Sequence, residues 1–332
     1  MKAMTLGDFV LMHEGLPTAA SRELSRLLLD VASCCNEIAS MVSNASVRGL
    51  AGAVDSTNVH GETQVPLDLA ANQVLMERLQ LSHHLGLFLS EESDDVIETR
   101  HCNAGSRYVI AVDPLDGSKL IDDAGTVGTI FAVFRTRKRA VTPSRDDFLQ
   151  PGRNLAAAGI AVYGAQTMLA YTTGHGVHLF AYDHFRREWV LVNEQLRMQE
   201  PQGSAVYSVN EGNSLKWRPE VQSFITELKS SAEPRFSQRY AGSLVADGLR
   251  VLRSGGVFLY PDEATSPRGK LRLVYECAPL ALLVEQAGGQ AVNTAGQPIL
   301  DVAPRDVHER SPLVIGHASH VNRFLRSLGR TV

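Results

Sequence analysis

The amino-acid sequence predicts an α/β fold in two domains. Helical and strand-like hydrophobic patterns alternate along its 332 residues, an order typical of layered α/β proteins. That length is enough for two buried cores. A composition of 44% hydrophobic and 20% charged residues is ordinary for a folded chain and leaves little room for extended disorder. We expect residues 1–196 to form the N-terminal domain and residues 197–332 the C-terminal domain, each of α/β type.

The first part of the chain predicts two helices joined by a loop. From Ser21 to about Ala45, apolar residues recur at helical spacing after a serine that can cap the first turn. A loop rich in Gly and Ala follows over residues 49–61. A second helical pattern begins near Leu67 and runs through Leu79.

The middle of the chain predicts one mixed sheet with a hairpin. Apolar segments separated by turn residues predict strands from Tyr108 to Val192, with the hairpin turn at Gly174-His175-Gly176. The polar residues 135–154 predict a surface excursion with a solvated basic cluster, and residues 193–204 predict a linker. After the first strand, the predicted strands cover residues 127–134, 156–164, 168–173, 177–182 and 187–192.

A second alternation of strands and helices follows the linker. Its pattern predicts another α/β layer set. The predicted strands cover residues 205–210, 256–261 and 311–317, and the predicted helices cover residues 219–229, 242–255 and 275–289.

The charge of the chain excludes several classes of partner. A formal net charge of −4 provides no basic field for nucleic acid or for an anionic membrane surface. The chain shows neither a secretory signal pattern nor an apolar run long enough to span a membrane. The four cysteines form no CxxC pair and are expected to be reduced thiols, so we expect a cytoplasmic protein.

The segment Tyr108 to Ser118, YVIAVDPLDGS, is the most informative stretch of the chain. Its apolar strand pattern predicts burial on both faces and ends in two closely spaced acids, Asp113 and Asp116. Ligands of open α/β sheets bind at the carboxyl ends of strands, and paired carboxylates favour a hard cation such as Mg²⁺. Gly117 permits a close approach of the backbone, and Ser118 can cap a following helix that faces an anion. The alternative is a solvated acidic turn.

Further acids and bases are placed where they can share a cleft with this turn. Five more acids lie at the ends of predicted strands or loops or at helix starts: Glu62, Asp68, Glu91, Glu92 and Glu276. A later group of cations and phenols suits a phosphate monoester: Arg239, Tyr240, Tyr260, Lys270, Arg272 and Tyr275. Taken singly, each of these residues is as easily a surface charge. Together the two groups indicate metal-assisted phosphoryl chemistry.

Given these motifs, the chain resembles class 1 fructose-1,6-bisphosphatase, within the metal-dependent, lithium-sensitive sugar phosphatases. The resemblance runs from about Thr5 to Leu325 and rests on segments in the same order, among them STNVHGET, LSEES, DPLDGS, LQPGRN, RYAGSLVAD, GKLRLVYE and VHERSP. It implies a layered α/β/α/β/α architecture and hydrolysis of the 1-phosphate of fructose 1,6-bisphosphate to fructose 6-phosphate. It also implies that the N-terminal domain carries most of the metal-binding acids and that the C-terminal domain binds the sugar phosphate.

The resemblance assigns roles to individual residues. It implies two or three Mg²⁺ ions, with Mn²⁺ as a substitute, and a homotetramer or homodimer in which Arg239 reaches into a neighbouring subunit's site. The implied metal ligands are Glu91, Asp113, the carbonyl of Leu115, Asp116 and Glu276, and the implied catalytic acids are Glu62, Asp68 and Glu92. The implied substrate-binding residues are Gly117, Ser118 and Lys119 at the 1-phosphate, Ser243 and Leu244 at the sugar, and Asn210, Arg239, Tyr240, Tyr260 and Lys270 at the 6-phosphate.

Departures from the family pattern leave other readings open. Lys119 stands where relatives have serine, and Asn213 stands where they have tyrosine. Pro17-Thr18-Ala19-Ala20 replaces the turn that binds AMP in many relatives, and residues 135–154 lack the cysteine insertion of light-regulated enzymes. The alternatives are a sedoheptulose 1,7-bisphosphatase, as sole or second activity, and a catalytically weak sugar-phosphate-binding regulatory subunit.

Overall fold

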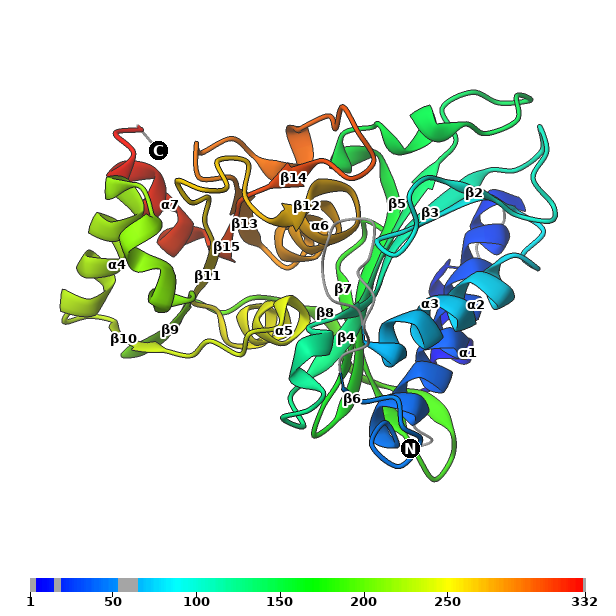
Figure 1. Ribbon diagram of the computed structural model, residues 1–332, viewed down its shortest axis with the longest axis horizontal. Helices are drawn as coiled ribbons and strands as arrows, with labels where there is room; N and C mark the ends of the chain where they lie inside the picture. Colours follow the sequence, from blue (N-terminus) through cyan, green and yellow to red (C-terminus); the bar gives the residue numbers. More distant parts are fainter. Residues whose placement is uncertain (1–3, 15–18, 53–64, 331–332) are drawn as a thin grey trace.

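The computed structural model describes residues 4–14, 19–52 and 65–330, which form five layers (Figure 1). The order of helix, sheet, helix, sheet and helix layers confirms the predicted α/β/α/β/α architecture. The first helix layer holds α1 (Leu6–Phe9), α2 (Ala19–Ser43) and α3 (Pro66–Leu79), the central layer holds α5 (Leu244–Ser254) and α6 (Ala278–Gln286), and the last holds α4 (Pro219–Ser230) and α7 (Ala318–Ser327).

The larger sheet has eight strands in the order β2-β1-β3-β4-β5-β6-β7-β8. The pair β1 and β3 is parallel and the other neighbours are antiparallel, so the predicted mixed sheet and its β6–β7 hairpin are confirmed. The strands are β1 (Leu85–Ser90), β2 (Ile97–Glu98), β3 (Tyr108–Asp116), β4 (Val127–Arg135), β5 (Leu155–Tyr163), β6 (Thr167–Thr172), β7 (Val177–Asp183) and β8 (Glu188–Leu196).

The smaller sheet has five strands in the order β10-β9-β11-β15-β13. A short ribbon of β12 (Leu271–Arg272) and β14 (Arg310–Ser311) lies apart from both sheets and leads into a π-helix, η6 (Leu273–Cys277). The five strands are β9 (Ser204–Ser208), β10 (Arg235–Gln238), β11 (Val257–Tyr260), β13 (Gly289–Val292) and β15 (Leu313–His317).

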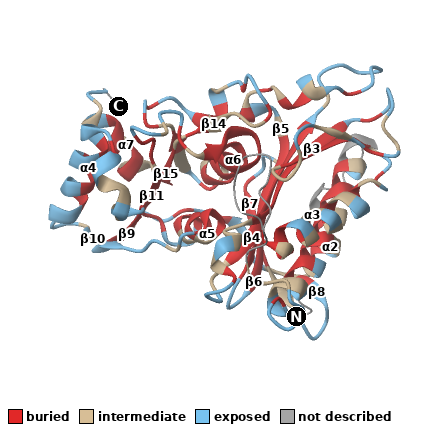
Figure 2. Ribbon diagram, in the orientation of Figure 1, coloured by how far each residue is buried: buried red, intermediate tan, exposed pale blue. Residues whose placement is uncertain are grey.

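Strand β3 is buried on both faces, as its sequence predicts, because helices cover both sides of the sheet. Successive side chains of a strand point to opposite faces, and β3 follows this rule. Ile110 and Val112 pack with α2 and α3 in one hydrophobic core, whereas Val109 and Ala111 pack with Tyr275 of the π-helix in another. Figure 2 shows the buried residues concentrated in the sheets and on the helix faces turned toward them.

Three local predictions are wrong. Helix α2 begins at Ala19, so Ser21 lies inside the helix instead of capping it. Strand β8 continues to Leu196, so residues 193–196 of the predicted linker belong to the strand. They do so because Leu196 still pairs with Val177 of β7. Ser118 caps no long helix: it opens a single 3₁₀ turn, Ser118–Leu120, with Gly117 at the capping position.

The predicted surface excursion has structure of its own. Residues 135–154 contain two 3₁₀ turns, Arg145–Phe148 and Gly152–Asn154, and the Phe148 side chain is fully buried against Phe134. The basic residues 137–139 are exposed, as expected. Within the part of the chain that the structure describes, no helix is both long enough and apolar enough to cross a membrane.

Candidate active site

A cleft of about 440 Å³ is lined by β3, by the start of α5 and by the π-helix η6. Fifteen of the eighteen predicted site residues line it, although they come from segments far apart in the sequence. They are Asp68, Glu91, Glu92, Asp113, Leu115, Asp116, Gly117, Ser118, Lys119, Tyr240, Ser243, Leu244, Tyr260, Lys270 and Glu276.

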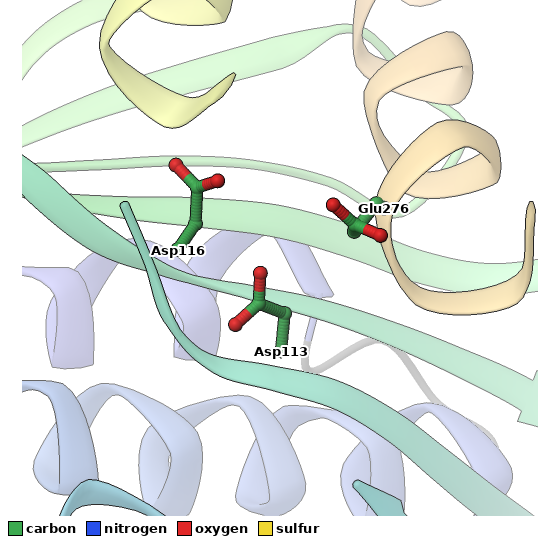
Figure 3. A group of neighbouring side chains, drawn as sticks. All are labelled: Asp113, Asp116 and Glu276. Atoms are coloured by element: carbon green, nitrogen blue, oxygen red, sulfur yellow. The ribbon is translucent and has the colours of Figure 1, made fainter. Parts of the chain in front are cut away.

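Three of the acids form a compact carboxylate cluster. One oxygen each of Asp113, Asp116 and Glu276 lies within 4.8 Å of the others. Figure 3 shows the two aspartates rising from β3 and Glu276 reaching toward them from the helical segment opposite. Asp113 and Glu276 are buried. Carboxylate oxygens at this separation suit a hard divalent cation, which would offset the repulsion between like charges held this close.

A bulge in β3 places both aspartates on the same side. In a regular strand, residues three apart point to opposite faces. Here Asp113 pairs with Ile130 and Asp116 pairs with Gly128, so three steps along β3 match two steps along β4. The extra residue brings both carboxylates to the cleft. The turn is held where the Leu115 amide donates to Asp113 Oδ1 at 3.1 Å and the Thr129 hydroxyl donates to the Pro114 carbonyl at 2.9 Å.

Helix α5 meets the turn from the other side of the cleft. The Ser243 hydroxyl and the Val245 amide donate to Asp116 Oδ2 at 2.7 and 3.0 Å. Gly117 has φ of 77°, and a Cβ atom there would lie 2.8 Å from Ser243 Cβ. Only glycine fits both the left-handed backbone and the close approach of α5. Asp116 and Gly117 therefore allow the turn and the start of α5 to pack closely on this side of the cleft.

Burial and mutual repulsion disturb the ionisation of the acids. Burial and the charge of Glu91 raise the pKa of Asp113 and of Glu276 well above their usual range. Burial raises the pKa of Asp116 to about 6, although hydrogen bonds from Val245 and Ser243 oppose it. A divalent cation reverses this effect by favouring the ionised form, so the cluster fits a metal centre.

Asp68 and Lys119 interact at the edge of the cluster. Asp68 lies in the first turn of α3 and accepts a hydrogen bond of 3.0 Å from the Val65 amide. Burial and the charge of Glu92 raise the pKa of Asp68 to about 7, although the Val65 hydrogen bond and the charge of Lys119 oppose the rise. A carboxylate with a pKa near 7 is suited to proton transfer at neutral pH. Lys119 is exposed and lines the same cleft.

Arg272 lines the cleft but was predicted only as part of the basic group, without a site role. The residue is 1% exposed, and its Nη2 atom lies 3.9 Å from Glu91 Oε1. Its Nη1 donates to the Lys270 carbonyl at 2.6 Å and its amide donates to Glu276 Oε2 at 2.5 Å. The sequence did contain a signal that Arg272 belongs to the cleft. Lys270 and Arg272 are two residues apart, and alternate residues of an extended segment face the same side.

A lysine and two tyrosines also line the cleft. Tyr240, Tyr260 and Lys270 line it together, and Lys270 Nζ lies 3.1 Å from Glu263 Oε1. An ammonium group and two phenol hydroxyls in one cleft can provide both charge and directed donors for a phosphate.

Two predicted residues do not line this cleft, and a third lies outside the part of the chain that the structure describes. Asn210 Oδ1 caps a 3₁₀ turn by accepting from the Gly212 amide at 3.1 Å. Arg239 is exposed, and its Nη1 donates to the Gln238 carbonyl at 2.7 Å. Glu62 lies outside the described residues.

Comparisons with known proteins agree with this geometry. The family model described as "Fructose-1-6-bisphosphatase, N-terminal domain" matches residues 4–194, and the C-terminal domain model of the same family matches residues 200–328. The holo form of Leishmania major fructose-1,6-bisphosphatase is 34% identical with a TM-score of 0.91, and the match covers 99% of this chain and 100% of that one. The apo form is 32% identical with a TM-score of 0.86 and the same coverage. The chain belongs to the fructose-1,6-bisphosphatase family and is a phosphoric monoester hydrolase.

Proposed function

We propose that this enzyme hydrolyses the 1-phosphate of fructose 1,6-bisphosphate, in a Mg²⁺-dependent reaction that yields fructose 6-phosphate and phosphate. The observation that carries the proposal is the single cleft that joins the carboxylate cluster to Lys270 and its neighbouring tyrosines. A metal centre and a phosphate pocket in one cleft suit a substrate with two phosphates. The likeness to the Leishmania major enzyme supports this substrate.

The donor set of the cleft suits two or three Mg²⁺ ions, with Mn²⁺ as a substitute. The proposed ligands are all hard oxygen atoms, from Glu91, Asp113, the Leu115 carbonyl, Asp116 and Glu276. When bound, Mg²⁺ polarises the phosphate and neutralises the negative charge that develops on the leaving sugar oxygen. Asp68 and Glu92, together with Glu62, orient the attacking water and accept its proton. The raised pKa of Asp68, about 7, suits it to hold that proton near neutral pH.

The chain's own donors position the substrate. The Gly117 amide, the Ser118 hydroxyl and the Lys119 ammonium hold the 1-phosphate, and Ser243 and Leu244 contact the sugar. Tyr240, Tyr260, Lys270 and Asn210 hold the 6-phosphate, with Arg239 supplied by a neighbouring subunit of a homotetramer or homodimer. Contacts to the remote phosphate contribute binding energy that orients the reacting one.

Phosphate release from fructose 1,6-bisphosphate, measured with Mg²⁺ and with EDTA, tests the proposal. We expect turnover with Mg²⁺, none with EDTA, and fructose 6-phosphate as the sugar product. Fructose 1-phosphate is the matched control, because it keeps the reacting group and lacks the remote phosphate, and it should be hydrolysed with a lower kcat/KM. Faster turnover of sedoheptulose 1,7-bisphosphate at equal concentration would replace the proposed substrate with that one. Equal turnover in EDTA would contradict the metal role.

A further inference from the structure

His308 connects two segments that carry proposed metal ligands. Its Nδ1 atom lies 2.9 Å from the hydroxyl of Tyr275, the residue before Glu276 in the π-helix. Its Nε2 atom lies 3.2 Å from the carbonyl of Asp94, in the turn after β1 that begins with Glu91 and Glu92. One imidazole ring therefore spans the two acid-bearing segments.

The ring is held by an ordered segment. The His308 amide donates to Asp306 Oδ1 at 2.9 Å, and the Leu273 amide donates to the Glu309 carbonyl at 2.7 Å. Arg145 ties the same segment to the turn after β1, since it lies 2.7 Å from Asp306 and 3.0 Å from Asp95. These contacts fix the backbone around His308. The imidazole ring can therefore hold both of its partners, Tyr275 and Asp94, in place.

The chemistry of the neighbours fixes the hydrogen-bond directions. The Asp94 carbonyl is only an acceptor, so Nε2 carries the proton and donates. Burial lowers the pKa of His308, so the ring is neutral and its Nδ1 accepts the Tyr275 hydroxyl proton. With the proton on Nε2, Nδ1 of the neutral ring has only a lone pair, so the Tyr275 hydroxyl is the donor of that contact. Both contacts are then ordinary neutral hydrogen bonds.

We propose that His308 is a positioning residue for the metal centre, holding Glu91 and Glu276 at the separation that divalent cation binding requires. The inference rests on the proposed metal role of the cleft. The two ligands are 185 residues apart in the sequence (276 − 91), so their spacing depends on contacts between segments. Partners that hydrogen-bond directly to metal ligands typically change metal affinity by 10–100-fold when they are replaced, and His308 acts on residues near the ligands, so we expect an effect at the lower end of that range. Tyr275 is fully buried, so its hydroxyl has no solvent to replace a lost partner.

Mn²⁺ binding followed by electron paramagnetic resonance, together with the Mg²⁺ dependence of phosphate release, tests this role. We expect His308→Ala to weaken Mn²⁺ binding about ten-fold and to raise the half-saturating Mg²⁺ concentration by a similar factor. The KM for the bisphosphate at saturating Mg²⁺ should change less than two-fold. His308→Asn keeps an acceptor near the Nδ1 position and should restore part of the affinity. Arg305→Ala, an exposed change in the same segment, is the matched control and should bind Mn²⁺ normally.

Tyr275→Phe provides a second route if His308→Ala does not fold. It removes only the hydroxyl and should also weaken Mn²⁺ binding, and in the double variant the two effects should not add. Unchanged Mn²⁺ affinity in a folded His308→Ala or Tyr275→Phe protein would overturn the inference. Mn²⁺ binding is measured without substrate. A wild-type protein that binds Mn²⁺ but does not hydrolyse fructose 1,6-bisphosphate would therefore refute the proposed substrate and leave the positioning role of His308 intact.

Discussion

Asp116 joins the two sides of the cleft, because it extends from β3 and accepts hydrogen bonds from Ser243 and Val245 of α5. Asp116→Asn keeps the size of the side chain and removes the charge that a divalent cation requires. We expect turnover below 1% of wild type (~100-fold loss or more) at saturating Mg²⁺, with an unchanged circular dichroism spectrum. Near-normal turnover in that variant would refute the metal assignment of Asp116.

Lys119 is the departure from the family pattern with the clearest electrostatic effect, since it lines the cleft and its charge lowers the pKa of Asp68. If its ammonium binds the reacting phosphate, Lys119→Ser should lower kcat/KM by about ten- to a hundred-fold. The variant should also shift the acid limb of the pH–rate profile to higher pH, because Asp68 loses a neighbouring positive charge and holds its proton more tightly. Lys138→Ser, in the exposed basic loop, is the control. A nearly silent change would show that Lys119 faces solvent, and a more active serine variant that needs less Mg²⁺ would show that it crowds a metal position.

Single residues differ in how far the sequence reveals them. Asp113 and Asp116 were predictable because two acids at the end of an apolar, buried strand are unusual, as the segment YVIAVDPLDGS shows. Arg272 was not assigned a site role, since a charged residue in a basic segment is normally exposed. Its burial depends on Glu91 and Glu276, whose approach no local pattern encodes. His308 is similar, because its partners Tyr275 and Asp94 come from separate segments.

The turn after β3, which packs against the start of α5, offers a test at the level of elements. Gly117→Ala forces an L side chain into a left-handed conformation and toward Ser243, whereas Gly174→Ala has a φ of 91° with nothing within 4 Å. The conformational penalty, about 1–2 kcal/mol, should lower the free energy of unfolding in both variants. Only Gly117→Ala should also lose activity, by about ten-fold or more, because the clash displaces residues 117–119, which we propose to hold the 1-phosphate. Urea unfolding and phosphate release measure the two effects separately, and equal activity in both variants would contradict the close packing at Gly117.

Elements with strong periodicity were predicted, and irregular ones were not. Helices α2 and α3 and the strands β3 to β7 follow from their hydrophobic patterns. The bulge that aligns Asp113 with Asp116 and the π-helix that carries Glu276 were not predicted, since each interrupts the regular period. Both irregularities lie at the carboxylate cluster. The division of the chain at residue 196 stays a prediction.

The carboxylate cluster should make the stability of the whole molecule depend on pH and metal together. Burial raises the pKa of Asp116 to about 6, and burial together with the charge of Glu91 raises the pKa of Asp113 and of Glu276 well above their usual range. Without metal, the contribution of these acids to stability is therefore present at pH 4 and is lost as pH rises, through about 6 for Asp116. A bound divalent cation should relieve this loss. We expect Mg²⁺ at a hundred times its Kd to raise the Tm by about 5 °C at pH 8 and by less at pH 5. Thermal scans with Mg²⁺ and with EDTA measure the difference, which Asp116→Asn should reduce. A larger Mg²⁺ effect at pH 5 would contradict the argument.

Arg239 tests whether the active site is completed by a second subunit. It is exposed and turned to its own backbone, outside the cleft of its own chain, whereas Tyr240 beside it lines that cleft. If Arg239 has the proposed role at the remote phosphate, Arg239→Ala should raise the KM for the bisphosphate more than it lowers kcat, because that contact would be present in ground and transition states alike.

Mixing Arg239→Ala chains with Asp116→Asn chains distinguishes the two geometries. If Arg239 serves a neighbour, a mixed dimer holds one complete site, made of the metal centre of the first chain and the arginine of the second. Unfolding and refolding an equal mixture should then restore roughly a quarter of wild-type activity at substrate concentrations below the KM of Arg239→Ala. Each variant refolded alone is the control. If Arg239 serves its own chain, the mixture contains no complete site, and its activity should equal the mean of the two controls.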